Sequence, residues 1–241
     1  STPIKSSAAS DVYKRQGETD RSGKSFTISA WINMDQYTNN SGSKGNVIMG
    51  HGPRVHMNYN GSLVLATTET GVLKIISGAS NKVTSVLETS VDLDTWTYLT
   101  LVYDNSDFSV SVYKDGTLVA TKNNTQQLEL FGDDPCIFFV GGAGFSGFCD
   151  EFQFFDRALN SNDVKQAYSN PQNISGLTVW YDFNTIEEGS SFTNKVTESD
   201  QVNTKATFYN LTGGQTNSDG GYISITNYTC LLYTSDAADD L

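Results

Sequence analysis

Apolar and polar residues alternate in short runs along most of the chain. In Phe26–Ile32 every second residue is apolar, so Phe26, Ile28, Ala30 and Ile32 share one face of an extended strand. Comparable runs occur at Asn46–Gly50, Val55–Tyr59, Leu63–Thr67, Leu73–Ile76, Val83–Leu87, Thr97–Tyr103, Phe108–Tyr113, Ile137–Gly142 and Gly147–Phe155. Many short strands separated by turn residues predict an all-β protein, either an antiparallel sandwich or a barrel.

The clearest turn in the chain is Asp115-Gly116. A two-residue turn there pairs Tyr113 with Leu118 and Val112 with Val119, and it needs a positive φ at both turn residues. We therefore expect the residues on either side to form one hairpin.

One segment has a helical pattern. Ser161 can cap the first turn, and Val164, Ala167 and Tyr168 lie on one face of a helix that ends before Asn170-Pro171. The pattern predicts one short helix after the last of the paired strands.

The two ends of the chain have an unusual relation. One DNA segment, read on opposite strands, can encode both Ser6–Gln16 and Cys230–Asp240, and that segment resembles a sequencing-library adapter. We therefore expect residues 1–16 and 230–241 to be adapter-derived and not native, as in a metagenomic fragment. The alternative is that both are natural disordered tails.

The net charge of −12 restricts the partners of the chain. An acidic surface repels phosphates, so we expect no nucleic acid partner and no binding to anionic membranes. Neutral glycans, basic proteins and calcium remain compatible with this charge. No apolar run is long enough to span a bilayer, so we expect no membrane insertion.

Four stretches together resemble the laminin-G-like jelly-roll family of the concanavalin A-like lectin/glucanase superfamily. They are Ser25–Ile32, Trp96–Tyr103, Val112–Leu118 and Phe139–Leu159, in the order and spacing of that family. The resemblance implies an antiparallel jelly-roll β-sandwich with one short helix, and the order of the stretches also resembles the pentraxin version of this fold.

The resemblance divides the chain at residue 170. It implies a jelly-roll domain over residues 17–170 in which the family's first strand is missing. Gly176–Phe183 resembles that missing strand. Residues 171–229 are therefore either the start of a second copy or a tail that completes the first domain.

Because the superfamily includes glucanases, the resemblance raises the question of catalytic carboxylates. A retaining glucanase needs two carboxylates on one face of a strand, as in Glu-x-Asp-x-x-Glu, and no such run is present. Asp150 and Glu151 are adjacent, so a regular strand would place them on opposite faces. Motifs for serine hydrolases, zinc proteases and phosphate binding are also missing. We expect no enzyme activity and no required cofactor.

Calcium is the metal that the chain could hold. Asp104 and Asp107 form one oxygen-rich cluster, and Asp133 and Asp134 form a second. The alternatives, which the sequence favours, are a solvated hairpin turn for the first cluster and a polar approach to a strand for the second. A pentraxin-type site would need acidic side chains in the loop at Gly141–Gly144, and this loop has none.

Two further groups of residues are candidates for ligand binding. His51, Arg54, His56 and Tyr59 could line a recognition face, although a surface or core histidine is the favoured alternative. The three tryptophans could stack on sugars, but the resemblance favours packing roles for them; they are Trp31, Trp96 and Trp180.

Cys136 and Cys149 form a testable pair. A two-residue turn at Gly142-Ala143 would place them opposite each other in a hairpin, within reach of a disulfide. A one-residue bulge would separate them and leave two buried free thiols. A disulfide would indicate an oxidising compartment.

Six sequons for N-glycosylation suit a secreted chain; they begin at Asn39, Asn60, Asn123, Asn173, Asn210 and Asn227. We expect an extracellular, cell-surface or virion-surface module that binds a glycan or an extracellular protein, beside neighbouring repeat domains of a larger protein. The alternatives are a spacer repeat of a surface or virion protein and an accessory domain attached to a glycoside hydrolase.

Overall fold

The computed structural model describes residues 24–37, 45–53, 62–78, 83–123, 136–142, 144–183, 195–196, 206–209, 214–217, 220–226 and 230–233. The expected strand Val55–Tyr59 lies outside these ranges. For the strands after residue 205 only the backbone pairing is described.

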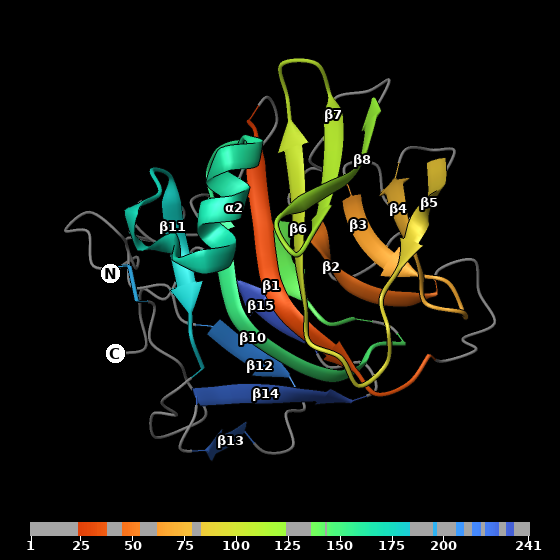
Figure 1. Cartoon of the computed structure of the whole chain (residues 1–241), viewed down its shortest axis with the longest axis vertical. Helices are drawn as coiled ribbons and strands as arrows, with labels where there is room; N and C mark the ends of the chain where they lie inside the picture. Colours follow the sequence, from red (N-terminus) through yellow and green to blue (C-terminus); the bar gives the residue numbers. More distant parts are fainter. Residues whose placement is uncertain are drawn as a thin grey trace, which may run out of the picture.

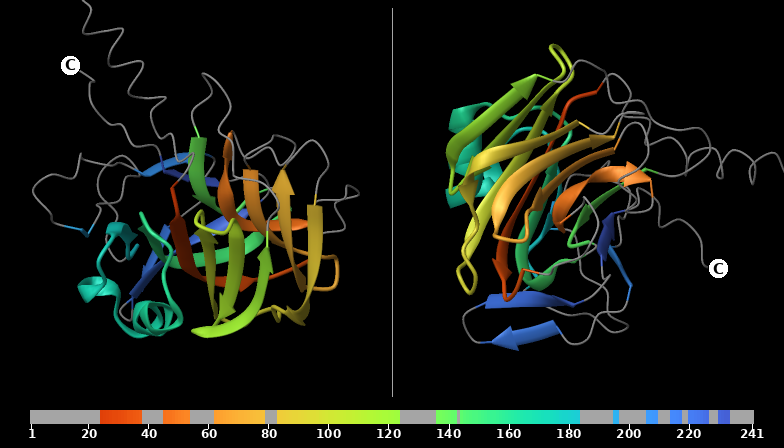
Figure 2. Two further views of the ribbon diagram at one scale, coloured as in Figure 1. Left: turned by 90° about the horizontal axis from the view of Figure 1, so that it is seen from above. Right: turned by 90° about the vertical axis from the view of Figure 1, so that its right-hand side faces the viewer.

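The described strands form two stacked antiparallel sheets (Figures 1 and 2). In the order β13-β14-β10-β1-β6-β7-β8, with β11 also paired to β10, sheet A contains β13 (Gly214–Asn217), β14 (Gly220–Thr226), β10 (Ser146–Phe155), β1 (Phe26–Met34), β6 (Thr97–Asp104), β7 (Ser109–Lys114), β8 (Thr117–Asn123) and β11 (Leu177–Tyr181). In the order β12-β15-β9-β2-β3-β4-β5, sheet B contains β12 (Ala206–Tyr209), β15 (Cys230–Tyr233), β9 (Cys136–Val140), β2 (Asn46–Pro53), β3 (Ser62–Thr67), β4 (Val72–Gly78) and β5 (Val83–Ser90). The predicted all-β, antiparallel jelly-roll sandwich is confirmed.

The core lies between the two sheets. The alternating residues of β1 predicted to share one face, from Phe26 to Ile32, are all fully buried there, and Met34 continues the row. Burial of each of the larger side chains, such as Phe26 and Ile28, contributes about 1.5–3 kcal/mol to the stability of the fold. The opposite face of β1 is also covered, because Thr27 and Ser29 are fully buried on the outer side of sheet A.

Helix α2 (Ser161–Ser169) covers that outer side, followed by the 3₁₀ turn η1 (Pro171–Asn173) (Figure 1). Val164 and Ala167 are buried in a second apolar cluster against sheet A, as predicted. The N-cap, however, is Asn160 and not Ser161, because the side chain of Asn160 accepts hydrogen bonds from the backbone N–H groups of Asn162 and Asp163.

The hairpin at Asp115-Gly116 has the predicted turn. Both residues have a positive φ, of 51° and 74°, and Tyr113 pairs with Leu118. The next predicted pair is wrong: Val112 pairs with Ala120 because a β-bulge shifts the register by one residue.

The predicted hairpin of Ile137–Gly142 with Gly147–Phe155 is wrong. β9 pairs with β2 and β15 in sheet B, whereas β10 belongs to sheet A. Gly141 and Gly144 have positive φ, and the chain crosses between the sheets there and does not turn back on itself. Cys149 is a free thiol, fully buried in the core, so the disulfide that this hairpin predicted is not formed.

The segment after η1 adds strands to the same sandwich. β11 pairs with one half of β10, through Phe152↔Tyr181 and Gln153↔Trp180, and β14 pairs with the other half. Val179, Tyr181 and Phe183 are buried in the same core as β1. β15, which lies within residues 230–241, pairs with β9.

Candidate functional site

A β-bulge in β10 is the starting point of the site. Ser29 pairs with Gln153 and Trp31 pairs with Asp150, so one residue of β1 faces Glu151 and Phe152 together. Glu151 has a φ of 50°, in the left-handed region that non-glycine residues occupy at a cost of about 1–2 kcal/mol. The backbone N–H of Glu151 donates to Oδ1 of Asp150 over 2.8 Å.

The bulge corrects the expectation that Asp150 and Glu151 face opposite sides of sheet A. Asp150 lies opposite Trp31, on the outer side of the sheet. The carboxylate of Glu151 accepts a hydrogen bond from Nε1 of Trp180, which projects from β11 on that same outer side, opposite Gln153. The regular alternation of a strand would have sent Glu151 into the core.

Charges gather around this pair. Asp182, at the end of β11, forms an ion pair of 3.1 Å with Lys195. The pKa of Asp150 is raised to about 7, mainly by burial; the backbone N–H of Glu151 lowers it, and the nearby carboxylates of Glu151 and Asp182 contribute to the rise. Burial also raises the pKa of Glu151, with a contribution from Asp182, whereas the indole of Trp180 and the charge of Lys195 lower it.

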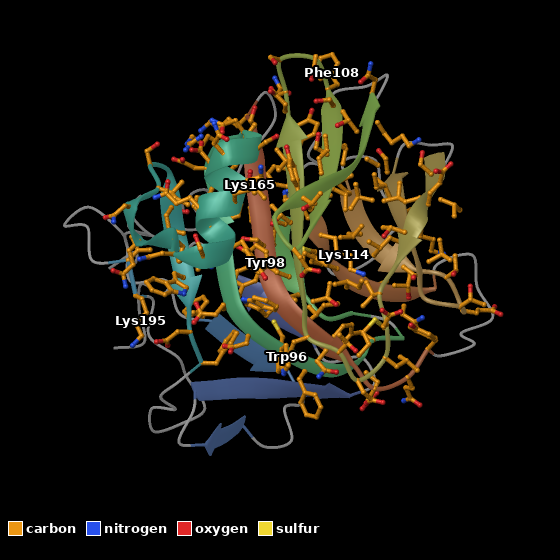
Figure 3. The ribbon with its side chains drawn as sticks, in the orientation of Figure 1. Trp96, Tyr98, Phe108, Lys114, Lys165 and Lys195 are labelled. Carbon is orange, nitrogen blue, oxygen red and sulfur yellow. The ribbon has the colours of Figure 1, made fainter. Side chains whose placement is uncertain are left out.

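A groove of about 840 Å³ lies beside Trp180, between β11 and the loop that contains η1. Its polar and aromatic lining includes Gln172, Asn173, Thr178, Trp180, Asp182 and Lys195. The backbone N–H of Lys195 donates to the carbonyl of Trp180 over 2.8 Å, which places Lys195 along β11 (Figure 3). The volume is within the range of small-molecule sites in proteins.

Hydrogen bonds from Asp156 and Arg157 fix the wall of the groove formed by the η1 loop. The N–H of Asp156 donates to the carbonyl of Gly176, and Nε of Arg157 donates to the carbonyl of Ser175 over 2.8 Å. Arg157 also forms an ion pair of 2.7 Å with Asp163 of α2. Gly176 has a φ of 81°, and a side chain there would meet Asp156, so glycine is required for this close approach.

An aromatic cluster borders the site on the side of α2. The rings of Trp31, Tyr98 and Tyr168 lie 5.3–5.5 Å apart, with Tyr98 fully buried between α2 and sheet A (Figure 3). The hydroxyl of Tyr98 lies 2.9 Å from Oγ of Ser29 and 3.0 Å from Oε1 of Gln153, and burial raises its pKa. Trp31 therefore has the sheet-packing role that the sequence favoured.

The predicted recognition face does not include His51. Its side chain is fully buried in the core, with ring centroids 4.6 Å from Phe138 and 5.4 Å from Phe26. Its assignment as a ligand-binding residue is wrong, because Phe138 of β9 and Phe26 of β1 pack against it inside the core. The remaining candidates lie outside the described residues; they are Arg54, His56 and Tyr59.

The first candidate calcium cluster forms the turn between β6 and β7. Oδ1 of Asp104 accepts from the N–H of Ser106, and Oδ1 of Asp107 accepts from the N–H of Ser109, both over 2.9 Å. These hydrogen bonds are those of the hairpin-turn alternative. Asp133 and Asp134 lie outside the described residues, and within the described ranges no three His, Cys, Asp or Glu residues are grouped to hold a metal. Calcium binding stays a prediction.

Two of the predicted sequons are described, and both asparagines are exposed. Asn123 ends β8, and Asn173 lies in η1 at the groove. The other four lie outside the described residues; they are Asn39, Asn60, Asn210 and Asn227. In the described part of the chain, no helix has the length and apolar character that crossing a membrane requires.

A sandwich of two antiparallel sheets with a helix on one outer face defines a class of jelly-roll proteins. A laminin G family model, described as the concanavalin A-like lectin/glucanases superfamily, matches residues 8–165. The chain belongs to this family. The matched range includes part of residues 1–16, and their adapter origin stays a prediction. No curated protein sequence matches the chain.

Several solved structures are similar to the chain. A proposed carbohydrate binding protein from Bacteroides ovatus has a TM-score of 0.54 and 16% identity, over 90% of this chain and 55% of that one. The CBM40 of an IT-sialidase from Ruminococcus gnavus, bound to α2,3 sialyllactose, has a TM-score of 0.48 and 14% identity over 62% and 85%. Domain 4 of a GH43 extracellular arabinanase from Geobacillus stearothermophilus, in complex with arabinotriose, has 0.46 and 19% over 61% and 67%. These likenesses concern the fold.

Proposed function

We propose that the chain is a non-catalytic carbohydrate-binding module and that the groove beside β11 is its binding site. The observation that carries the proposal is the lining of the groove, where the indole of Trp180 stands among amide, hydroxyl and charged side chains. An indole offers an apolar face to the C–H groups of a sugar ring, and the polar groups can bond to its hydroxyls. Carbohydrate binding proposed for the Bacteroides ovatus protein of the same fold agrees with this function.

The charges of the groove favour a neutral sugar. Lys195 is paired with Asp182, and Arg157 is paired with Asp163, so neither cation is left to attract an anionic ligand. The whole chain is acidic as well. An uncharged oligosaccharide would meet no electrostatic repulsion here.

Glu151 supports binding over catalysis. Its carboxylate is engaged by the indole of Trp180, at a bulge immediately beside Asp150, and it does not form a separated pair across the groove. We propose that recognition serves a larger extracellular or surface protein, with neighbouring domains that carry any further activity.

Binding to an array of neutral and acidic glycans tests the proposal, with Trp180→Ala as the variant and Trp96→Ala as its matched control. Trp96 is 39% exposed and does not line the groove. We expect Trp180→Ala to weaken binding about tenfold or more, and Trp96→Ala to bind as the unchanged protein does. No binding to any glycan, or equal losses in both variants, would contradict the proposal.

A further inference from the structure

The backbone of Glu151 has a strained, left-handed conformation that a glycine at this position would adopt at a lower cost. With a φ of 50°, the position favours glycine or asparagine, which enter the left-handed region most readily. A glutamate at such a position is unusual, and strained residues of this kind gather at functional sites. A functional role for the side chain of Glu151 would explain why glutamate and not glycine stands here.

The side chain of Glu151 fixes an aromatic ring of the groove. Its carboxylate accepts the N–H of the Trp180 indole, the only hydrogen-bond donor of that ring. The bulge is what allows the contact, because it turns Glu151 out of the core and toward the outer side of sheet A. A hydrogen bond to a carboxylate is about twice as strong as one to a neutral acceptor.

Groups from each neighbouring element face Glu151. Asp150 lies beside it on β10, Asp182 follows the last residue of β11, Lys195 approaches from the segment after β11, and the hydroxyl of Tyr98 approaches from β6. The negative charge of Asp182 raises the pKa of Glu151, and Lys195, its ion-pair partner, lowers it. Burial, with the charge of Asp182, favours the uptake of a proton by Glu151.

We propose that Glu151 is a positioning residue: its ionised carboxylate holds the Trp180 indole in the orientation that the groove needs, and ligand binding therefore weakens in acid. The ligand part of this inference rests on the proposed carbohydrate binding. The contact between Glu151 and Trp180 does not, so the two can fail separately.

The contact can be measured without a ligand. In the full chain labelled with ¹⁵N, the three indole N–H signals are assigned by replacing Trp31, Trp96 and Trp180 with phenylalanine in turn. We expect the Trp180 signal to shift with pH in a single transition, above the range of an ordinary glutamate because burial raises the pKa of Glu151. In Glu151→Gln, which keeps an acceptor but has no charge, this transition disappears. A Trp180 signal that titrates identically in both proteins overturns the proposal.

Wild type, Glu151→Gln and Glu151→Gly are then compared to separate positioning from a purely structural role. For each protein, the affinity for a glycan identified on the array and the thermal unfolding midpoint are measured. We expect Glu151→Gln to bind about fivefold more weakly than wild type at pH 8 and to be insensitive to pH. Glu151→Gly removes the contact while accepting the left-handed backbone, so it should bind about tenfold or more weakly without a lower midpoint. Unchanged binding by Glu151→Gly, or a loss of binding matched by a loss of stability, overturns the proposal.

The NMR titration and the binding measurements together distinguish the proposed carbohydrate binding from the proposed positioning role of Glu151. If no glycan binds while the Trp180 signal still follows Glu151, carbohydrate binding is wrong and the positioning contact stands. If glycans bind through Trp180 equally well in all three proteins, carbohydrate binding stands and the role of Glu151 is wrong.

Discussion

At the scale of single residues, the site depends on Asp150 and Glu151, whose neighbours in the fold could not be predicted from the sequence. Regular alternation predicts opposite faces for Asp150 and Glu151, and the bulge places both near Asp182. Asp182 and Lys195 carry no motif, and they meet only because the chain runs back along β11. The one available signal was the resemblance of Gly176–Phe183, which contains Trp180, to the first strand of the family.

Asp150 has a measurable effect on the pH dependence of stability. Its pKa rises from 3.8 to about 7 on folding, so between these values the folded state binds more protons than the unfolded state. The contribution of Asp150 to the free energy of unfolding therefore decreases as the pH rises from about 4 to about 7, and it stays low above that range.

We expect Asp150→Asn to remove this pH dependence. Asparagine keeps an oxygen that can accept the N–H of Glu151 but cannot ionise. At pH 8 the variant should be more stable by about 2 kcal/mol, allowing for the partial exposure of the carboxyl, and at pH 4 the two proteins should differ little. Urea unfolding at pH 4, 6 and 8 checks this, and a variant less stable at pH 8 would contradict it.

At the scale of elements, the sequence predicts what local patterns determine. The alternating residues of β1, the turn at Asp115-Gly116 and the buried face of α2 all follow from spacing. Partner choice between strands does not, because β9 and β10 are close in sequence and yet belong to different sheets. Burial of each apolar face against the other sheet decides their partners, and no turn dipeptide reports that.

The cap of α2 gives an element-scale test. Replacing Asn160 with alanine leaves two backbone N–H groups without their partner, so we expect a loss of about 1 kcal/mol and a midpoint lower by about 2–4 °C. Ser161→Ala is the matched control, because it removes only the contact of 3.2 Å with the hydroxyl of Tyr113. Equal losses of stability in the two variants would contradict the assignment of Asn160 as the N-cap.

At the scale of the whole molecule, the open point in the sequence was residues 171–229. A second copy would be separable from the first domain, whereas a completing tail would not. β11 supplies Val179 and Tyr181 to the shared core, Phe183 joins them from just after the strand, and we propose that this segment completes the domain.

Truncation tests this proposal. A chain that ends at Asn170 lacks β11 and its buried aromatic rings, so we expect no cooperative unfolding transition. A chain that ends at Val196 retains β11 and Lys195, and we expect it to be the more stable of the two. Heat unfolding followed by circular dichroism compares them, and a cooperative transition in the shorter chain would favour a second copy.

The position of β10 also bears on how the protein is made. Once residue 155 has left the ribosome, β10 can pair with β1, but the half of its other edge that β11 covers stays bare until Leu177–Tyr181 follows. At about 5–20 residues per second that wait lasts on the order of one to a few seconds. A bare strand edge pairs readily with another chain. We therefore expect slow translation just after α2 to lower the yield of this sandwich, because the bare edge can then pair with a neighbouring nascent copy.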